Sequence, residues 1–300
     1  MTVVAPDQLL CGQWDKYFTP EFTFSNNAWG KDDSGGSCLN VTQNATTIST
    51  TWKWTNTTSL TSVHAFPNLL LNTLQQSPLP ISNLTSLTAH VDWHMGPSTM
   101  YSSSTFEADA LREVNATANV AFDMFLDPQR ARAGDTGMAG WEVMVWLASV
   151  GPSYPIGYFD TPTTTASSST TSSRPTCKMG GVDFELFTGT NPHNQTVHTF
   201  VATHNTTHFT GDLASGIYYL SDHNLLPRDT YLGVVQFGTE TFFADEYVTF
   251  TATGVGFDVV RNDTGTRGGV EKSAAGSARL GGRRKGAVVM GLLVVVALVL

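Results

Sequence analysis

Positive charge is scarce in this chain. Its 300 residues include 16 Lys and Arg against 25 Asp and Glu, so the formal net charge is −9. Binding a nucleic-acid backbone needs a basic surface, and the composition therefore argues against nucleic acid as a partner. Charged residues make up only 14% of the chain, whereas 41% is hydrophobic and 11% aromatic. This balance is typical of all-β extracellular proteins, whose exposed strand faces carry hydroxyl groups in place of ions.

Signals for two common kinds of catalytic site are also missing. No Gly-x-Ser-x-Gly turn occurs, so a serine hydrolase of that type is not supported. The pairs His90/His94 and His204/His208 lie in strand-like or sequon contexts. Three intervening residues do not align two ligands there as they would on a helix. We therefore expect neither a metal nor a cofactor.

Cysteine is the third scarce type, with Cys11, Cys38 and Cys177 alone in the chain. The first two can close an early loop, which fits an oxidising compartment. Cys177 is then left over, and a free or buried thiol is the expected state. Asn-x-Ser/Thr sequons are abundant in contrast, and their spread favours a glycosylated extracellular protein. They begin at Asn40, Asn44, Asn56, Asn83, Asn115, Asn194, Asn205 and Asn262.

The N-terminus does not match the extracellular prediction. Residues 1–10 contain no basic residue, and their apolar run is too short for a secretory leader. We expect the true leader to be missing from this sequence and residues 1–10 to be an N-terminal remnant. A cytosolic protein is the alternative, and the sequons argue against it.

The C-terminus predicts membrane attachment. A polar, Gly-rich segment at 261–285 has the composition of a linker, and 286–300 is an apolar run of fifteen residues. Spanning a bilayer takes about 20 apolar residues, so the run is short for a transmembrane helix. Small residues at 273–276, a spacer and an apolar tail match a glycosylphosphatidylinositol signal. We favour a lipid anchor over a transmembrane tail.

Between these ends, residues 11–260 predict one all-β domain. Short alternating runs separated by Gly, Asn, Pro, Ser and Thr indicate a jelly-roll sandwich of two curved antiparallel sheets. One short helix is expected at 216–224, where the apolar residues have weak helical spacing. Eleven of the thirteen residues at 161–173 are Ser or Thr. We treat 161–176 as an insertion within the domain because strand patterns continue after it.

Two strand-like stretches carry unusual faces. In Trp141–Leu147 (WEVMVWL), period-two alternation places Glu142, Met144 and Trp146 on one side and apolar residues on the other. In Val234–Phe242 (VVQFGTETF), Gln236, Gly238 and Glu240 share a face. These polar and aromatic faces suit the floor of a wet cleft. If both strands belong to one curved sheet, the two glutamates face each other across it.

A facing pair of glutamates has the chemistry for glycoside cleavage. The reaction needs an acid to protonate the leaving oxygen and a carboxylate to meet the positive charge growing at the anomeric carbon. Retaining enzymes hold the two carboxyls about 5 Å apart, a range that neighbouring strands provide. Asp123, in the alternating run NVAFDMF, is a third candidate: close to Glu142 it would help to separate the two pKa values. An exposed surface position for Asp123 is the equal alternative.

The sequence resembles glycoside hydrolase family 12 over roughly residues 11–260. Several blocks in the same order carry the resemblance: WEVMVWLASVGPSYPIG (Trp141–Gly157), VVQFGTETF (Val234–Phe242), SNNAWG (Ser25–Gly30), WKW (Trp52–Trp54), NVAFDMF (Asn119–Phe125) and TFVATHNTTHFTGD (Thr199–Asp212). The resemblance implies an endo-β-1,4-glucanase of the cellulase type, a monomer that works without a cofactor. It leaves the polymer open among cellulose-like glucan, mixed-linkage glucan and xyloglucan.

The resemblance also implies residue roles. Glu142 corresponds to the nucleophile, Glu240 to the acid/base and Asp123 to an aspartate that hydrogen-bonds the nucleophile. The residues matched to the cleft, or sharing its face, are Asn27, Trp29, Met144, Trp146 and Gln236. Cys11 and Cys38 match an N-terminal disulfide, whereas Cys177, the Ser/Thr-rich insertion and the anchor-like tail depart from the family pattern. A glucan transglycosylase and a non-catalytic glucan-binding surface protein remain as alternatives.

Overall fold

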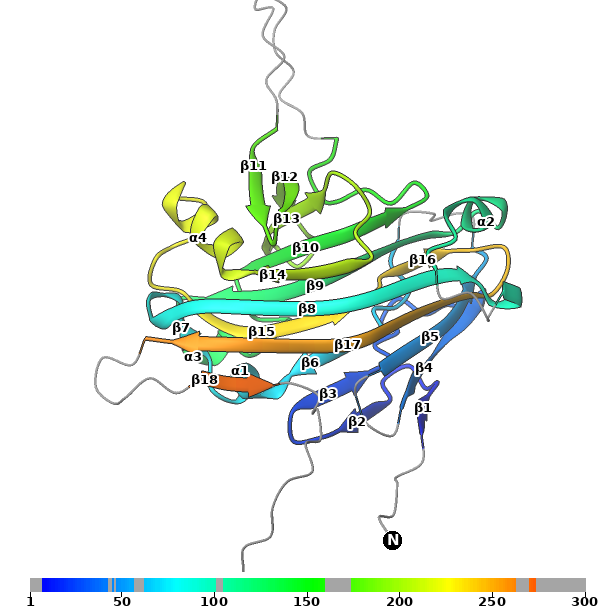
Figure 1. Ribbon diagram of the computed structural model, residues 1–300, viewed down its shortest axis with the longest axis horizontal. Coiled ribbons are helices and arrows are strands. Elements are labelled where there is room, and N and C mark those ends of the chain that lie inside the picture. The colour runs from blue at the N-terminus through cyan, green and yellow to red at the C-terminus, as the bar shows by residue number, and fades with distance from the viewer. Residues whose placement is uncertain are drawn as a thin grey trace, which may run out of the picture.

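Two β-sheets packed face to face make up the computed structural model. It describes residues 7–42, 45, 47–56, 62–100, 105–159, 174–262 and 270–273. The long strands of both sheets run side by side along the molecule (Figure 1). The jelly-roll sandwich predicted from the alternating sequence pattern is confirmed.

The smaller sheet contains seven strands and forms the back of the sandwich. Its order is β1 (Gln8–Leu10), β4 (Gly35–Val41), β5 (Thr47–Trp54), β17 (Val248–Arg261), β8 (Leu84–Pro97) and β14 (His208–Asp212), with β18 (Val270–Ser273) beside β17. β18 falls inside the segment predicted to be a linker, so part of that segment extends the sheet instead. Residues 1–6, most of the predicted insertion (161–173), most of the predicted linker (263–269 and 274–285) and the apolar tail (286–300) lie outside the described residues.

The larger sheet contains eleven strands and carries the candidate cleft face. Its order is β11 (Thr176–Met179), β12 (Val182–Thr190), β13 (Thr196–Ala202), β10 (Trp141–Val150), β9 (Thr117–Asp127), β15 (Tyr231–Gly238), β6 (Asn68–Leu71), β3 (Phe22–Ser25) and β2 (Lys16–Phe18), with β16 (Thr241–Phe243) beside β9 and β7 (Leu79–Pro80) beside β15. β10 and β13 pair in parallel.

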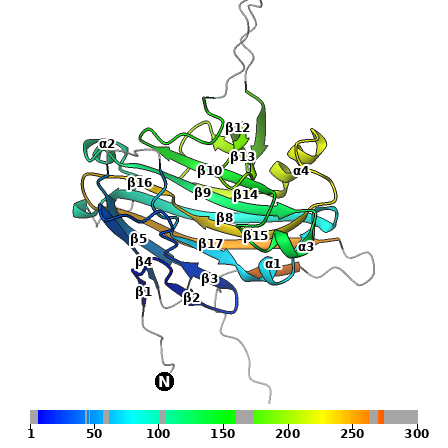
Figure 2. The same cartoon turned by 180° about the vertical axis from the view of Figure 1, so that it is seen from behind.

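In the part of the chain that the structure describes, four short α-helices border the sheets (Figure 2). They are α1 (Asn72–Gln76), α2 (Ala108–Glu113), α3 (Arg130–Ala133) and α4 (Ala214–Asp222). α4 confirms the helix predicted at 216–224, and the other three were not predicted. They are four to six residues long, too short to show a helical period. Within the described chain, no helix is both long and apolar enough to cross a bilayer.

The core fills the space between the two sheets. On β9 the inward residues Val120, Phe122 and Leu126 are fully buried, as their alternation predicts. Phe122 packs against Phe237 of β15 and Phe257 of β17, with ring centroids 4.7 and 5.9 Å apart. The core therefore fixes which face of the large sheet turns away from it, toward the candidate site.

Several sequence predictions outside the site are settled by the fold. Trp52 and Trp54 of the WKW block are fully buried, so this pair belongs to the core. Cys11 and Cys38 form the expected disulfide, which ties the chain before β2 to β4. Cys177 is a free, half-buried thiol on β11, and burial raises its pKa.

Candidate active site

One face of the large sheet collects the predicted catalytic carboxylates. β9 lies between β10 and β15, so the two glutamate-bearing segments are not neighbours. The prediction that adjacent strands bring the glutamates together is corrected by this middle strand. β9 pairs with β10 on one side and with β15 on the other. In these two registers, Asp123 of β9 lies opposite Met144 of β10 and opposite Gln236 of β15. Asp123 therefore occupies the strand between the two glutamates.

Glu240 is held by an asparagine that the sequence analysis missed. β15 ends at Gly238, and Glu240 lies in the connection to β16 rather than on one continuous strand. The Asn119 side-chain amide donates to the Glu240 carboxylate. In return, the Glu240 backbone N–H donates to Asn119 Oδ1 at 2.9 Å. Both groups of the Asn119 amide thus fix this glutamate above β9.

Glu142 has its own amide partner, from a loop. Asn191 Nδ2 donates to Glu142 Oε2 at 3.0 Å and to Gln195 Oε1 at 2.8 Å. Asn191 Oδ1 accepts the backbone N–H groups of His193 and Gln195, each at 3.0 Å. Gln195 Nε2 donates to the carbonyls of Thr136 and Ala139 at 2.8 Å. This network orients the carboxylate of Glu142 at the start of β10.

Asp123 is buried close enough to both glutamates for their charges to affect its pKa. Its side chain is 5% exposed, and Oδ1 has no hydrogen-bond partner. The register places Asp123 opposite Met144 and diagonally from Glu142 on the same face, so the hydrogen bond to Glu142 implied by the family resemblance stays a prediction. Burial, with the charges of Glu142 and Glu240, raises the pKa of Asp123 well above its ordinary value.

The pKa values of both glutamates are raised. Burial raises the pKa of Glu142 to about 7, and the hydrogen bond from Asn191 limits that rise. Burial and the charge of Glu142 raise the pKa of Glu240 to about 8, against the opposing hydrogen bond from Asn119. Because a charge on one carboxylate opposes ionisation of the other, the pair holds one proton after the first carboxyl has ionised. One ionised and one protonated carboxyl are the two states that an acid and its anionic partner need.

Three further predicted residues line the floor between the glutamates. Met144 is 5% exposed, Trp146 3% and Gln236 8%. The indole Nε1 of Trp146 points to Met144 Sδ at 3.5 Å, and both side chains pack on Ala121 of β9. Trp146 thus packs beside Met144 and has almost no exposed ring face. A direct stacking role for Trp146 does not fit this burial.

The predicted contacts Asn27 and Trp29 lie in the loop after β3. Asn27 adopts a φ of 43°, and its carbonyl accepts the Phe66 N–H at 3.0 Å. The ring of Trp29 is 51% exposed. His64 donates its backbone N–H to the Thr241 carbonyl at 2.9 Å, which links this region to the segment after Glu240. Gly30, next to Trp29, donates its backbone N–H to the His64 carbonyl at 3.0 Å, so hydrogen bonds join the loop that carries the exposed ring to the segment after Glu240.

Comparison with known proteins agrees with this arrangement. Residues 20–259 match the profile of Glycosyl hydrolase family 12. The chain belongs to this family. It is 34% identical over 237 residues to xyloglucan-specific endo-beta-1,4-glucanase A of Emericella nidulans, covering 77% of this chain and 83% of that protein. It is 32% identical to xyloglucan-specific endo-beta-1,4-glucanase 1 of Phytophthora nicotianae, with 77% and 84% covered.

Solved family 12 structures show the same fold. Endoglucanase 3 of Trichoderma harzianum superposes with a TM-score of 0.65 at 24% identity, covering 85% of this chain and 98% of that one. The family 12 xyloglucanase of Bacillus licheniformis also gives 0.65, at 18% identity and with 84% and 100% covered. The predicted family and the predicted enzyme class, a glycoside hydrolase, are both confirmed.

Three residues of this family 12 enzyme that hold the glutamates were not predicted, and only one of them has a signal in the sequence. Asn119 lies on β9, four positions before Asp123 and thus on the same face, so the period-two pattern carried the signal. Asn191 and Gln195 lie between β12 and β13, near the loop turn, where no periodicity marks a side chain as directed toward the site. Only the fold brings them to Glu142.

The Asn191 contact predicts a shift in pH dependence. In Asn191→Asp, Oδ1 still accepts the loop amides of His193 and Gln195, but the donor to Glu142 is lost and a like charge is added. The pKa of Glu142 then rises. Since activity requires ionised Glu142, we expect the acidic limb of the kcat/KM profile to move to higher pH by at least about one unit.

Thermal unfolding separates this effect from a structural one. We expect the melting temperature of Asn191→Asp to fall only slightly, because the two backbone N–H groups still donate to Oδ1 and the loop loses one hydrogen bond, that to Gln195 Oε1. A pH profile that is unchanged in Asn191→Asp, with lower stability, contradicts a role for Asn191 in tuning Glu142.

Proposed function

We propose that this protein is a retaining endo-β-1,4-glucanase in which Glu142 is the nucleophile and Glu240 the acid/base. The observation that carries the assignment is one sheet face holding two half-buried glutamates with separate amide donors, Asn191 and Asn119. The charge of Glu142 affects the pKa of Glu240, so the two carboxyls lie within electrostatic reach. The state that these roles need has Glu142 ionised and Glu240 protonated.

Glycosylation is the first chemical step. Glu142 attacks the anomeric carbon and forms a carbon–oxygen bond while the bond to the departing sugar breaks. Glu240 gives its proton to the departing oxygen, so no free alkoxide forms. Met144, beneath this position on the floor, provides an apolar and polarizable surface for the sugar ring. Asp123, neutral beside the glutamates, adds no further negative charge near the nucleophile.

Deglycosylation reverses these roles. Glu240, now ionised, takes a proton from water as the water oxygen attacks the anomeric carbon. The bond to Glu142 breaks, and the carboxylate returns to its hydrogen bond with Asn191. Two inversions at one carbon leave the product with the β configuration of the substrate.

Xyloglucan is the polymer we propose as the preferred substrate. The relatives from Emericella nidulans and Phytophthora nicotianae, which align over most of both chains, carry the name xyloglucan-specific endo-beta-1,4-glucanase. The exposed ring of Trp29 gives a glucan chain an aromatic platform on one side of the carboxylates. Cellulose-like and mixed-linkage glucans have the same backbone linkage and are the competing substrates.

Rates measured side by side on three polymers test this proposal. We expect kcat/KM on xyloglucan to exceed that on carboxymethyl cellulose and on mixed-linkage β-glucan by roughly tenfold or more. Viscosity should fall well before reducing ends accumulate, because internal bonds are cut. A higher kcat/KM on carboxymethyl cellulose contradicts the substrate assignment. A viscosity that falls only in proportion to the number of reducing ends released contradicts endo action.

We also propose that the enzyme works outside the cell, glycosylated and held by a C-terminal lipid anchor. The disulfide between Cys11 and Cys38 fits an oxidising compartment. Asn40 and Asn56 are half-buried, and Asn44 lies outside the described residues. The other sequons begin at exposed residues: Asn83, Asn115, Asn194, Asn205 and Asn262. Retention on membranes after treatment with phosphatidylinositol-specific phospholipase contradicts the anchor.

A further inference from the structure

A buried histidine lies next to the segment that carries Glu240, and no step of the proposed mechanism uses it. The imidazole of His64 stacks on the buried indole of Trp54, with ring centroids 4.8 Å apart and an interplanar angle of 13°. Its Nε2 lies 3.3 Å from Asp32 Oδ2. An ionised carboxylate only accepts hydrogen bonds, so Nε2 is the donating nitrogen. Stacking and this hydrogen bond together fix the orientation of the ring.

Asp32 is held in its ionised state by donors of its own loop. The Ser34 hydroxyl and backbone N–H donate to Asp32 Oδ1 at 2.6 and 2.9 Å. Asn56 Nδ2 donates to Asp32 Oδ2 at 2.7 Å. These hydrogen bonds, above all the one from the Ser34 side chain, hold the pKa of Asp32 well below its ordinary value. The carboxylate therefore offers His64 a fixed negative acceptor.

The backbone of His64 joins two parts of the candidate site. The His64 carbonyl accepts the Gly30 N–H at 3.0 Å, next to the exposed ring of Trp29. The His64 N–H donates to the Thr241 carbonyl at 2.9 Å. Thr241 directly follows Glu240 in the chain. One residue is thus bonded both to the Trp29 loop and to the segment of the proposed proton donor.

Both chain neighbours of Glu240 are bonded to the segment that begins at His64. The Thr241 N–H donates to the Ala65 carbonyl at 2.9 Å. The Thr239 N–H donates to the Pro67 carbonyl at 3.3 Å. The backbone position of Glu240 is therefore set by residues 64–67 on this side.

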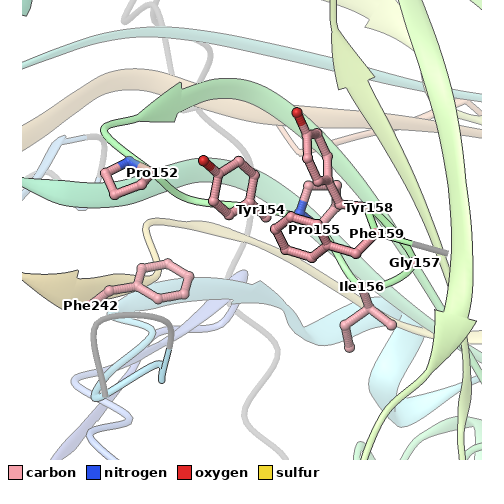
Figure 3. A pocket seen from close by; sticks show the side chains of 8 residues that line it. All are labelled: Pro152, Tyr154, Pro155, Ile156, Gly157, Tyr158, Phe159 and Phe242. Carbon is pink, nitrogen blue, oxygen red and sulfur yellow. The ribbon is translucent and has the colours of Figure 1, made fainter. Parts of the chain in front are cut away.

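The two faces of β16 differ in how firmly they are packed. On one face, Trp54 Nε1 donates to Thr241 Oγ1 at 3.0 Å. On the other, Phe242 lines a hollow of about 240 Å³. Figure 3 shows Phe242 facing this space, with the loop at 152–159 across it. Packing on the hollow side is incomplete, so the position of the segment depends more on Trp54 and His64.

We propose that His64, oriented by Asp32, is a positioning residue that keeps Glu240 within reach of the oxygen it protonates. This role rests on the proposed function, because it takes Glu240 as the proton donor. Neither His64 nor Asp32 needs to touch the sugar. Without their hydrogen bond, the imidazole is free to turn on Trp54 and the backbone at 64–67 loosens. A displacement of about 1 Å at a catalytic group can slow a reaction by roughly 10²-fold.

Two aryl glycosides that share one sugar isolate the effect on proton donation. Phenyl β-cellotrioside has a poor leaving group that needs a proton, whereas 2,4-dinitrophenyl β-cellotrioside has one that does not. Contacts with the cellotriosyl part, those of Trp29 included, are the same for both. In Asp32→Ala, we expect kcat/KM on the phenyl glycoside to fall roughly tenfold and that on the dinitrophenyl glycoside to stay within about twofold of the wild type.

Substitutions at His64 separate the hydrogen bond from packing. His64→Gln keeps a donor near the position of Nε2, and it should retain most of the wild-type ratio of the two rates. His64→Leu keeps the bulk without the donor, and it should match Asp32→Ala. Because the two residues act as a unit, the double variant Asp32→Ala/His64→Leu should lose no more than either single variant. If Asp32→Ala does not fold, equal rate ratios in His64→Gln and His64→Leu overturn the positioning role.

Asp33→Ala is the matched control, because Asp33 is the neighbouring acidic residue and is exposed. It should change neither rate, and a change like that of Asp32→Ala would assign the effect to the charge of the loop and overturn the pair. Equal falls on both glycosides in Asp32→Ala, no change on either, or additive losses in the double variant also overturn it, while the proposed function stands. Wild-type enzyme that cleaves neither glycoside nor xyloglucan overturns the proposed function, and the positioning role with it.

Discussion

Replacement of Glu142 by glutamine is expected to abolish hydrolysis, with a fall in kcat of at least about 10⁴-fold on soluble xyloglucan. An amide cannot form the glycosyl ester, so both steps of the double displacement are lost. Glutamine keeps the size of the side chain and can still bond to Asn191, so polymer binding should persist. The measurement is reducing-end release over time, with binding measured on the same polymer.

Glu113→Gln is the matched control, because Glu113 is exposed on α2. This variant should keep the wild-type rate. A Glu142→Gln enzyme that retains activity within tenfold of the wild type contradicts the nucleophile assignment. The melting temperatures of Glu142→Gln and the wild type are compared at the same pH. A much lower value for the variant would attribute the loss of activity to unfolding.

Replacement of Glu240 by glutamine is expected to produce the second-largest loss, and one that depends on the leaving group. On xyloglucan, kcat should fall roughly 10²- to 10⁴-fold, because the departing sugar oxygen receives no proton. On β-cellotriosyl fluoride, the first step should proceed and the glycosyl-enzyme accumulate, since fluoride needs little protonation. Azide should then restore turnover and give the β-glycosyl azide. Equal losses on both substrates contradict the acid/base role.

Stability of the Glu240→Gln variant gives an independent check with a definite sign. The pKa of Glu240 is raised in the folded protein to about 8, from an ordinary value of 4.5. The folded state therefore binds this proton more tightly, and the stability gained from it, complete below pH 4.5, is lost as the pH rises through 8. Glutamine does not ionise. The difference in melting temperature, Glu240→Gln minus wild type, should thus become more positive as the pH rises from 4 to 9.

The alternation of residues within single strands predicted which side chains of those strands face the candidate site. Alternation in β10 placed Glu142 and Met144 on one face, and in β9 it turned Phe122 toward the core. It also placed Trp146 on the cleft face, which is correct. The burial of Trp146 was not predictable, since it depends on Ala121 from a second strand and on the register irregularity of β10 after Trp146.

The features of the candidate site that the sequence did not reveal depend on how strands distant in the sequence pair with one another. That β9 separates β10 from β15 follows from sheet order, which hydrophobic patterns within a strand do not encode. The same register places Asp123 opposite Met144 and diagonally from Glu142. Asn191, 49 residues from Glu142 in the chain, reaches it only through the parallel pairing of β10 with β13. Its loop has no pattern that marks it as catalytic.

Trapping the glycosyl-enzyme tests the central assignment most directly. A 2,4-dinitrophenyl 2-deoxy-2-fluoro-β-cellobioside slows both steps but keeps a good leaving group, so the first intermediate persists on a retaining enzyme. Peptide mapping by mass spectrometry then locates the added sugar. The account predicts a single label on Glu142, within the strand Trp141–Val150. A label on Glu240 or Asp123, or no label together with a product of inverted configuration, would contradict it.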